Sequence, residues 1–211
     1  MKKSIAIGIT AVSLATMVSA QNFATEKSDG GYISGKVGVW NLQTKNDMKI
    51  PVSDGWDTTM VPVSTTSDRE NWTGASLAAG YRFNSQFRCE GEFGYAEKTG
   101  SSLSTVMAQG YLDIPIANSS LVPYINVGFG SVSLKPDGMD GNPNTECWNI
   151  GVGCSLAMSE NFTLDASLRH FQSGALKYST TRGDDWNGYY TTDYSFKLNS
   201  NTFLVGVRYI F

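Results

Sequence analysis

The stretch TGASLAAGYRFNSQFRCEGEFGYA, residues 73–96, alternates in polarity on both sides of the short polar segment Asn84-Ser85-Gln86. Apolar residues occupy every second position up to Phe83, and small or charged residues fill the positions between them. After the segment, aromatic residues such as Phe93 occupy one alternate set and the charges occupy the other. Successive side chains of a β-strand point to opposite faces, so this stretch predicts two antiparallel strands joined by a tight turn.

The same alternation recurs along the chain and predicts eight strands, at 32–41, 73–83, 87–96, 103–114, 122–134, 147–158, 162–171 and 198–211. Three connections are short. Four are longer, namely the polar segments 42–72 and 172–197 and smaller loops near 97–102 and 135–146. An even number of strands joined alternately by short turns and long loops is typical of an up-and-down transmembrane barrel. The predicted fold class is all-β, an eight-stranded antiparallel transmembrane barrel with long extracellular loops.

Composition narrows the possible functions. The chain has 22 Gly and 25 aromatic residues but only 6 Pro among 211 residues, a balance that favours strands and turns. Its formal net charge of -3 leaves no basic stripe to neutralise phosphates, which argues against a nucleic-acid partner. Beyond the N-terminal region no run of eighteen apolar residues occurs, so the chain could cross a membrane only as a closed barrel.

The N-terminus has the pattern of a secretory signal peptide. Lys2 and Lys3 precede an apolar stretch, and small residues at Val18-Ser19-Ala20 stand before Gln21. We predict a cleaved signal peptide at 1–20, a short periplasmic segment at 21–30 and a barrel at 31–211. An apolar stretch this short is not expected to span a membrane as a helix.

The two faces of the predicted strands distinguish a membrane barrel from a soluble sandwich, whose apolar face would point inward. The polar faces are rich in Gly, Ala and Ser, which suits a narrow lumen. They also carry nine charged residues, which we predict to form a lumenal charge network: Lys36, Arg82, Arg88, Glu90, Glu92, Asp113, Asp165, Arg169 and Arg208. Five basic and four acidic groups could pair as a structural plug, or exchange partners in a narrow pore for ions or small solutes.

We predict no metal site and no cofactor. Cys147 and Cys154 are seven residues apart on one predicted strand, over 20 Å at ~3.3 Å per residue, and Cys89 belongs to another strand. We therefore expect three unpaired thiols. Loop residues such as Asp137 and Asp140 lack the spacing of a calcium-binding loop.

Two stretches resemble a known family. In TFLVGVRYIF, residues 202–211, one face carries Phe203, Val205, Val207, Tyr209 and Phe211, and this resembles the C-terminal signature of bacterial outer-membrane proteins. VPYINVGFG, residues 122–130, resembles a strand of the small opacity-protein and outer-membrane-protein-A-like barrels, with Asn126 in place of a Gly. The resemblance implies a location in the bacterial outer membrane. It also implies that the C-terminal residues are an assembly signal for the barrel assembly machinery, and that outer-membrane lipid and lipopolysaccharide surround the wall.

The same resemblance implies a structural scaffold whose extracellular loops recognise host or environmental ligands, in surface recognition or adhesion. Trp56, Trp186, Tyr189 and Tyr190 are the candidate recognition residues, because exposed loop aromatics on a rigid scaffold commonly make contacts. The alternative for Trp72, Tyr194 and Trp186 is that they anchor the barrel at the lipid interface.

An enzymatic role rests on His170 alone. Lipid A 3-O-deacylases are similar small barrels that use a lipid-facing His and a Ser two residues later. Here residue 172 is Gln and the nearest Ser is Ser173. An odd offset points two strand residues to opposite faces unless a bulge intervenes, so we predict no enzymatic activity and rank a lipid A-modifying hydrolase below the pore.

Overall fold

The computed structural model describes residues 29–53, 58–135, 142–184 and 188–211, and the regular secondary structure of these residues consists of eight antiparallel strands. Side chains are described for 29–45, 61, 66–135, 142–177 and 195–211. The strands are β1 (Gly30–Ser53), β2 (Thr58–Arg82), β3 (Phe87–Lys98), β4 (Ser101–Asp113), β5 (Leu121–Lys135), β6 (Asn144–Ala157), β7 (Phe162–Asp184) and β8 (Gly188–Ile210). No helix among these residues is long and apolar enough to cross a membrane.

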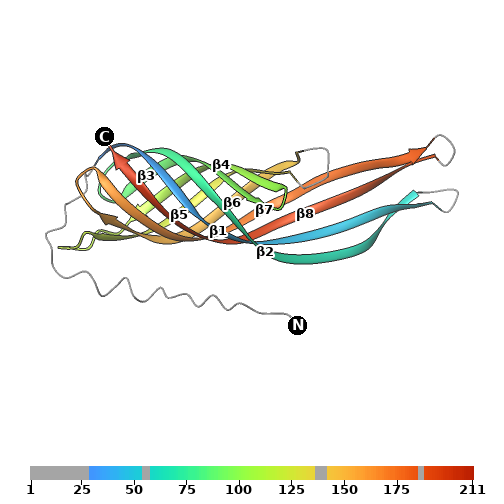
Figure 1. Cartoon of the computed structure of the whole chain (residues 1–211), viewed down its shortest axis with the longest axis horizontal. Coiled ribbons are helices and arrows are strands. Elements are labelled where there is room, and N and C mark those ends of the chain that lie inside the picture. The colour runs from blue at the N-terminus through green and yellow to red at the C-terminus, as the bar shows by residue number, and fades with distance from the viewer. Residues whose placement is uncertain (1–28, 54–57, 136–141, 185–187) are drawn as a thin grey trace.

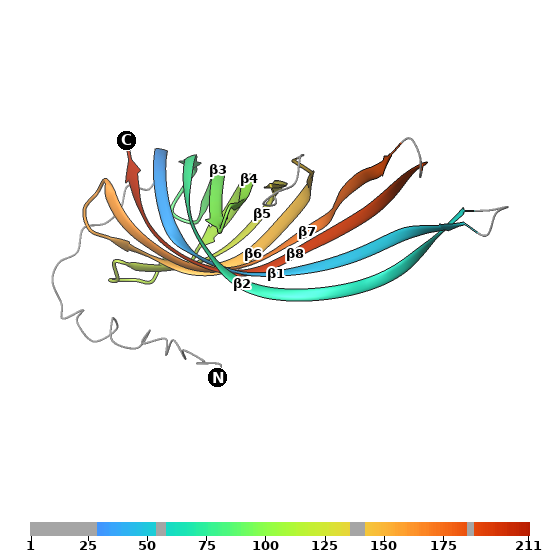
Figure 2. The same ribbon diagram turned by 45° about the vertical axis from the view of Figure 1, so that its right-hand side comes forward.

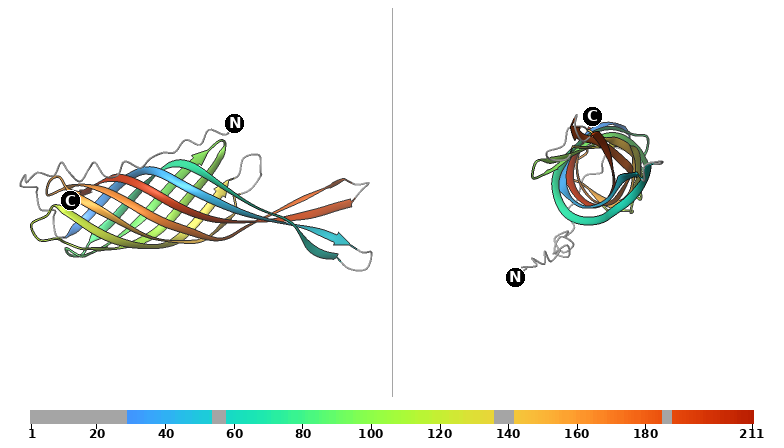
Figure 3. Two further views of the ribbon diagram at one scale, coloured as in Figure 1. Left: turned by 90° about the horizontal axis from the view of Figure 1, so that it is seen from below. Right: turned by 90° about the vertical axis from the view of Figure 1, so that its right-hand side faces the viewer.

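Each strand pairs with its neighbours in the chain, and β1 pairs with β8, so the sheet closes into a barrel. The end-on view in Figure 3 shows the closed ring. The predicted fold class is confirmed. The short turns that follow β2, β4 and β6 lie at the same end as the C-terminus (Figure 1), and the hairpins β1–β2 and β7–β8 extend from the other end.

The strands are staggered around the ring. Directly paired residues lead from Gly30 through Arg82, Arg88, Tyr111, Asn126, Gly151, Arg169 and Thr202 back to β1 at Trp40, ten residues beyond the start. A stagger of this size in an eight-stranded barrel goes with a strand tilt of about 40°. Two side chains at the same height on adjacent strands are therefore not direct partners, because they are offset from each other by one or two residues along the strand.

The barrel is apolar outside and polar inside. Outward residues such as Leu77, Val106 and Phe129 are 69%, 61% and 64% exposed, whereas inward residues such as Gln109 are buried. Exposed aromatic residues border this apolar band at both ends. At the end with the short turns they are Tyr81, Phe83, Phe87, Phe162, Tyr209 and Phe211, and at the opposite end they are Tyr95 and Trp148. A band of this kind is expected to face lipid, and a soluble sandwich would bury it.

The prediction that 42–72 and 172–197 are loops was wrong. β1 and β2 stay paired to Ser53 and Thr58, and β7 and β8 to Asp184 and Gly188. Since β1 also pairs with β8 as far as Lys49 and Asp193, β7, β8, β1 and β2 continue beyond the ring as one sheet (Figures 1 and 2). We name this part the projecting sheet. Beyond the ring there is neither lipid nor lumen to impose two different faces, so the strands lack the alternation that identifies them in sequence.

The connection expected near 97–102 is also shorter than predicted. Lys98 pairs directly with Ser101, leaving Thr99 and Gly100 as a two-residue hairpin turn. Their φ angles, 45° and 83°, are both positive, as the favoured two-residue turn between twisted strands requires. Thr99 is an unusual residue for such a turn, which explains why the sequence pattern did not reveal it.

Candidate functional site

All nine charged residues predicted for the lumen lie inside the barrel and are buried, each at most 7% exposed. They come from six strands and form three groups of ion pairs in the half of the lumen nearer the short turns. Their positions on inward faces follow directly from the alternation. Which charge pairs with which follows from the stagger of the strands.

The largest group joins β1, β3, β4 and β7. Lys36 donates hydrogen bonds to both Glu90 and Glu92, at 2.6 Å for the Glu92 Oε2 atom. Arg169 donates from Nη1 to the two carboxylate oxygens of Glu92 at 2.8 and 3.0 Å. Tyr111 donates to Glu90 and accepts from Arg169 Nη2 at 2.9 Å. Two carboxylates therefore share two cations and one phenol in a space with little exposure.

The second group centres on Asp113 of β4. Arg82 Nη2 donates to Asp113 Oδ2 at 2.6 Å, and Arg88 Nε donates to both oxygens at 3.1 Å. The Arg88 guanidinium also lies over the Tyr111 ring, 3.8 Å from its centre. One carboxylate thus serves two arginines, and the aromatic face gives one of them further stabilisation.

The third group lies between β6, β7 and β8. Ser155 donates to Asp165 at 2.6 Å, and Arg208 Nη2 lies 3.2 Å from Ser155 Oγ and 3.7 Å from Asp165 Oδ1. Each group thus balances buried cations with at least one carboxylate. Buried charge is costly unless it is paired and hydrogen-bonded, so this arrangement has the features of a structural plug.

The half of the lumen nearer the projecting sheet is apolar, which the sequence analysis missed. A cluster of buried side chains fills it: Leu42, Trp72, Ala96, Leu103, Met107, Val132, Leu134, Cys147, Phe171, Leu176, Phe196 and Leu198. We name this cluster the apolar plug. Several members lie in segments predicted as loops, and others interrupt inward faces read as polar. The blurred alternation around Leu103 was the available sign of it.

The position of Trp72 contradicts the prediction that this residue anchors the barrel at the lipid interface. Its side chain is 6% exposed and belongs to the apolar plug, so it is not a lipid-interface anchor. β2 pairs with β3 from Thr73 onward, and its even-numbered residues from Trp72 to Arg82 are buried or partly buried, so Trp72 is on the lumenal face of the strand. The side chain of Tyr194 lies outside the described side chains.

The apolar plug predicts a barrel that does not conduct ions. Water and ions are disfavoured in a narrow apolar constriction, and the charged side chains between the apolar plug and the short turns already have partners. We expect no steady conductance steps when the folded protein is reconstituted in a planar bilayer, with a wide general porin as the positive control. Reproducible steps that vanish in Glu90→Gln or Arg82→Gln would contradict this and support the pore.

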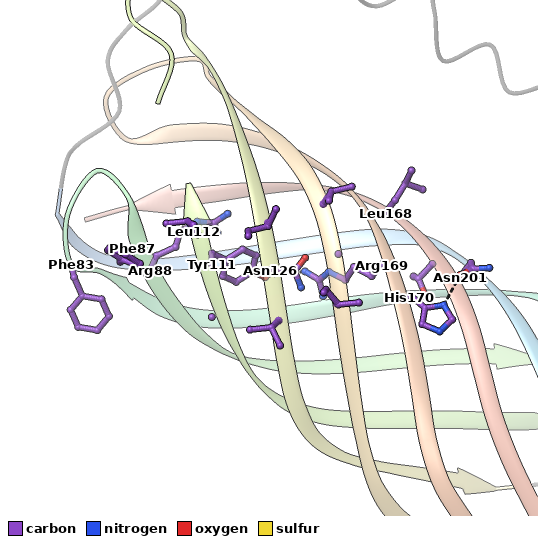
Figure 4. Close-up of a pocket in the computed structure, with 17 residues that line it drawn as sticks. Phe83, Phe87, Arg88, Tyr111, Leu112, Asn126, Leu168, Arg169, His170 and Asn201 are labelled. Carbon is purple, nitrogen blue, oxygen red and sulfur yellow. Dashed lines mark hydrogen bonds between the residues drawn. The ribbon is translucent and has the colours of Figure 1, made fainter. Parts of the chain in front are cut away.

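His170 and Ser173 lie on opposite faces of β7. His170 Nδ1 is 2.9 Å from Asn201 Oδ1 on the outer face, at the edge of an apolar groove that passes Leu112 and Leu168 (Figure 4). Ser173 is buried, donates to the Gly174 carbonyl at 2.8 Å and accepts from the Leu198 amide at 3.0 Å. The register shifts between Gln172 and Ala175, yet this bulge does not bring the hydroxyl to the imidazole.

The remaining predicted residues fall into three sets. Phe203, Val205, Val207, Tyr209 and Phe211 share the outer face, each 42% to 64% exposed, and their role as an assembly signal stays a prediction. Trp56 and Trp186 lie outside the described residues. Tyr189 and Tyr190 belong to β8 by backbone, and their side chains are not among those described.

The three cysteines are free, as expected, with Cys147 inside the apolar plug. Within the described ranges, no three His, Cys, Asp or Glu side chains gather as a metal site would require. Asp137 and Asp140 fall in the part of the third long connection that lies outside those ranges. The signal peptide predicted at 1–20 also lies outside them.

A closed eight-stranded barrel with an apolar outer band, aromatic borders and buried ion pairs defines a small transmembrane barrel. Residues 10–211 match the outer membrane protein beta-barrel domain family, and the chain belongs to that family. It is therefore an outer-membrane protein, which confirms the predicted localisation and the predicted resemblance.

Individual relatives agree with this assignment. Outer membrane protein PagN of Salmonella typhimurium is 25% identical over 241 residues, covering 95% of this chain and 98% of PagN. Neisserial surface protein A shares the fold at a TM-score of 0.53 and 18% identity, over 88% of this chain and 100% of that one. OprG of Pseudomonas aeruginosa does so at 0.53 and 11%, over 89% and 99%.

Proposed function

We propose that this protein is a non-enzymatic outer-membrane scaffold that presents the projecting sheet for recognition of host or environmental ligands. One observation carries the proposal: β7, β8, β1 and β2 continue well beyond the ring as hydrogen-bonded strands. Paired strands hold one another in position, so the strand ends at Ser53, Thr58, Asp184 and Gly188 lie on a stiff support. Recognition residues on a rigid scaffold lose less entropy on binding than those on a free loop.

The interior of the barrel also supports the proposal of a non-enzymatic scaffold. The charged side chains in the lumen are paired, and the apolar plug fills the half of the lumen nearer the projecting sheet. The wall and lumen together therefore make a solid support. This disfavours the narrow pore. The separation of His170 from Ser173 removes the one dyad on which a lipid A-modifying hydrolase was considered.

The test shortens the two arms without touching the ring. Asn46 pairs with Thr66, and Thr181 pairs with Thr191, so Asn-Gly turns can replace residues 47–65 and 182–190. We expect attachment of bacteria displaying the chain to cultured epithelial cells to fall roughly tenfold or more when both arms are shortened.

A second variant tests the predicted recognition residues at full arm length. It carries the substitutions Trp56→Ser, Trp186→Ser, Tyr189→Ser and Tyr190→Ser. Both variants must retain the faster migration of the unheated folded barrel on a gel. Undiminished attachment by a folded, double-shortened barrel would contradict the proposal.

A further inference from the structure

The outer end of the β7–β8 hairpin carries the tripeptide Arg182-Gly183-Asp184. These are the last three residues of β7. Their direct partners on β8 are Tyr190, Tyr189 and Gly188. Because the pair of Asp184 with Gly188 is the last of the hairpin, the tripeptide lies at the far end of a paired strand and not in the middle of the sheet.

This end of the hairpin stands apart from the rest of the projecting sheet. β6 pairs with β7 only as far as Ser173, and β1 pairs with β8 only as far as Asp193. Beyond these residues the hairpin is a two-stranded ribbon without a further partner strand in the described part of the chain, and it separates from the β1–β2 hairpin (Figures 1 and 2). From Gly174 to Asp184 the strand advances ten residues, roughly 33 Å along its length. A large partner can therefore approach the free edge of β7 at the tripeptide without meeting the barrel.

The two charged residues of the tripeptide share one face of the strand. Successive strand residues belong to opposite faces, so Arg182 and Asp184 lie on one face and Gly183 on the other. A Gly within a strand weakens it, and it often marks a bulge or a place where another chain approaches closely. Among the paired residues of β7 and β8 the register shifts only between Gln172 and Ala175, so no bulge accounts for Gly183. Its position fits close approach by a partner.

The residue types indicate the chemistry of that partner. A carboxylate such as that of Asp184 is a preferred ligand of Mg²⁺ and Ca²⁺. A guanidinium group binds a carboxylate through two parallel hydrogen bonds. Asp185 follows in the sequence and makes residues 182–185 acidic overall, which disfavours a polyanion as the partner. Arg182 and Asp184 therefore fit a receptor that presents a divalent cation beside an acidic pocket. Integrins, a class of animal cell-surface receptors, bind Arg-Gly-Asp with this combination of groups.

We propose that Arg182-Gly183-Asp184 is a binding site for a host integrin. Asp184 supplies a ligand to the divalent cation of the receptor, and Arg182 binds its acidic pocket. This inference rests on the proposed function and names the class of partner. The three residues are distinct from the four aromatic residues predicted for recognition.

The test measures binding of the folded barrel in detergent to the purified ectodomain of the vitronectin receptor, an integrin that recognises this tripeptide. We expect binding in Mg²⁺ and its loss in EDTA. Asp184→Glu keeps the charge but moves the carboxylate by one methylene group, so the apparent Kd should rise roughly tenfold or more. The matched control is Asp193→Glu, the same substitution on β8 at the partner of Ser179, which should leave the Kd unchanged.

A competition experiment identifies the receptor site. A cyclic Arg-Gly-Asp peptide should displace the barrel from the integrin, whereas a cyclic Arg-Gly-Glu peptide should not. Each variant must show the faster migration of the unheated folded barrel. Equal binding by Asp184→Glu and the wild type, an equal loss in Asp193→Glu, or binding that persists in EDTA would overturn the proposal.

Attachment of bacteria to epithelial cells that carry the vitronectin receptor separates this inference from the proposed function. We expect Asp184→Glu to reduce attachment and Asp193→Glu to leave it unchanged. If Asp184→Glu attaches like the wild type while the double-shortened barrel does not, the projecting sheet recognises another ligand and only the integrin site is overturned. If the double-shortened barrel also attaches fully, the proposed function fails as well.

Discussion

Gly38→Val is expected to prevent the barrel from closing. Gly38 lies on the lumenal side of β1, and a Cβ there would overlap the carbonyl oxygen of Phe203 on β8 and come within 2.9 Å of its carbonyl carbon. Both are backbone atoms of a paired strand and cannot move aside as a flexible side chain could. Because β1 and β8 form the closing seam, the clash would leave two open strand edges. We expect the fast-migrating folded band of an unheated sample to disappear.

Gly35→Val is the matched control for this prediction. Gly35 is on the same strand but faces lipid, and a Cβ there would meet only the Leu77 side chain at 3.6 Å. An apolar side chain suits that face, so this variant should fold like the wild type. Equal folded yields of the two variants after refolding into detergent would show that the close approach at Gly38 is not required.

Asp113→Ala is expected to lower the free energy of unfolding by about 3–5 kcal/mol. The substitution removes the carboxylate that accepts hydrogen bonds from both Arg82 and Arg88, leaving two guanidinium groups buried in the lumen. Breaking a buried ion pair from one side costs more than the pair contributes, because the remaining charge stays desolvated. The measurement is urea-induced unfolding in lipid vesicles, followed by tryptophan fluorescence.

Glu70→Gln provides the comparison at a surface pair. Glu70 and Lys98 are 3.1 Å apart, with side chains 51% and 35% exposed, so removing this ion pair should cost at most about 1 kcal/mol. Similar losses in the two variants would mean that the lumen is well hydrated around Asp113. That result would also revive the pore as a candidate function.

The sequence was sufficient for the class of fold and for the inner and outer faces within the ring. A strand that separates lipid from lumen must alternate with a period of two, and this local pattern is visible without knowing any partner strand. It placed Glu92 and Arg169 inside and Leu168 outside. It failed for 42–72 and 172–197, because the projecting sheet has no such separation and its strands look like polar loops.

Only the tertiary structure decided which groups meet. Glu92 contacts Lys36 and Arg169 from strands that are not its neighbours, because the ring brings β1, β3 and β7 to face one another across a narrow lumen. The apolar plug depends in the same way on the ten-residue stagger, which sets residues distant in sequence at one height. A period of two in a single strand specifies a face. The height of a side chain in the barrel and the groups that it contacts are set by the closed ring, because both depend on the tilt and register of all eight strands together.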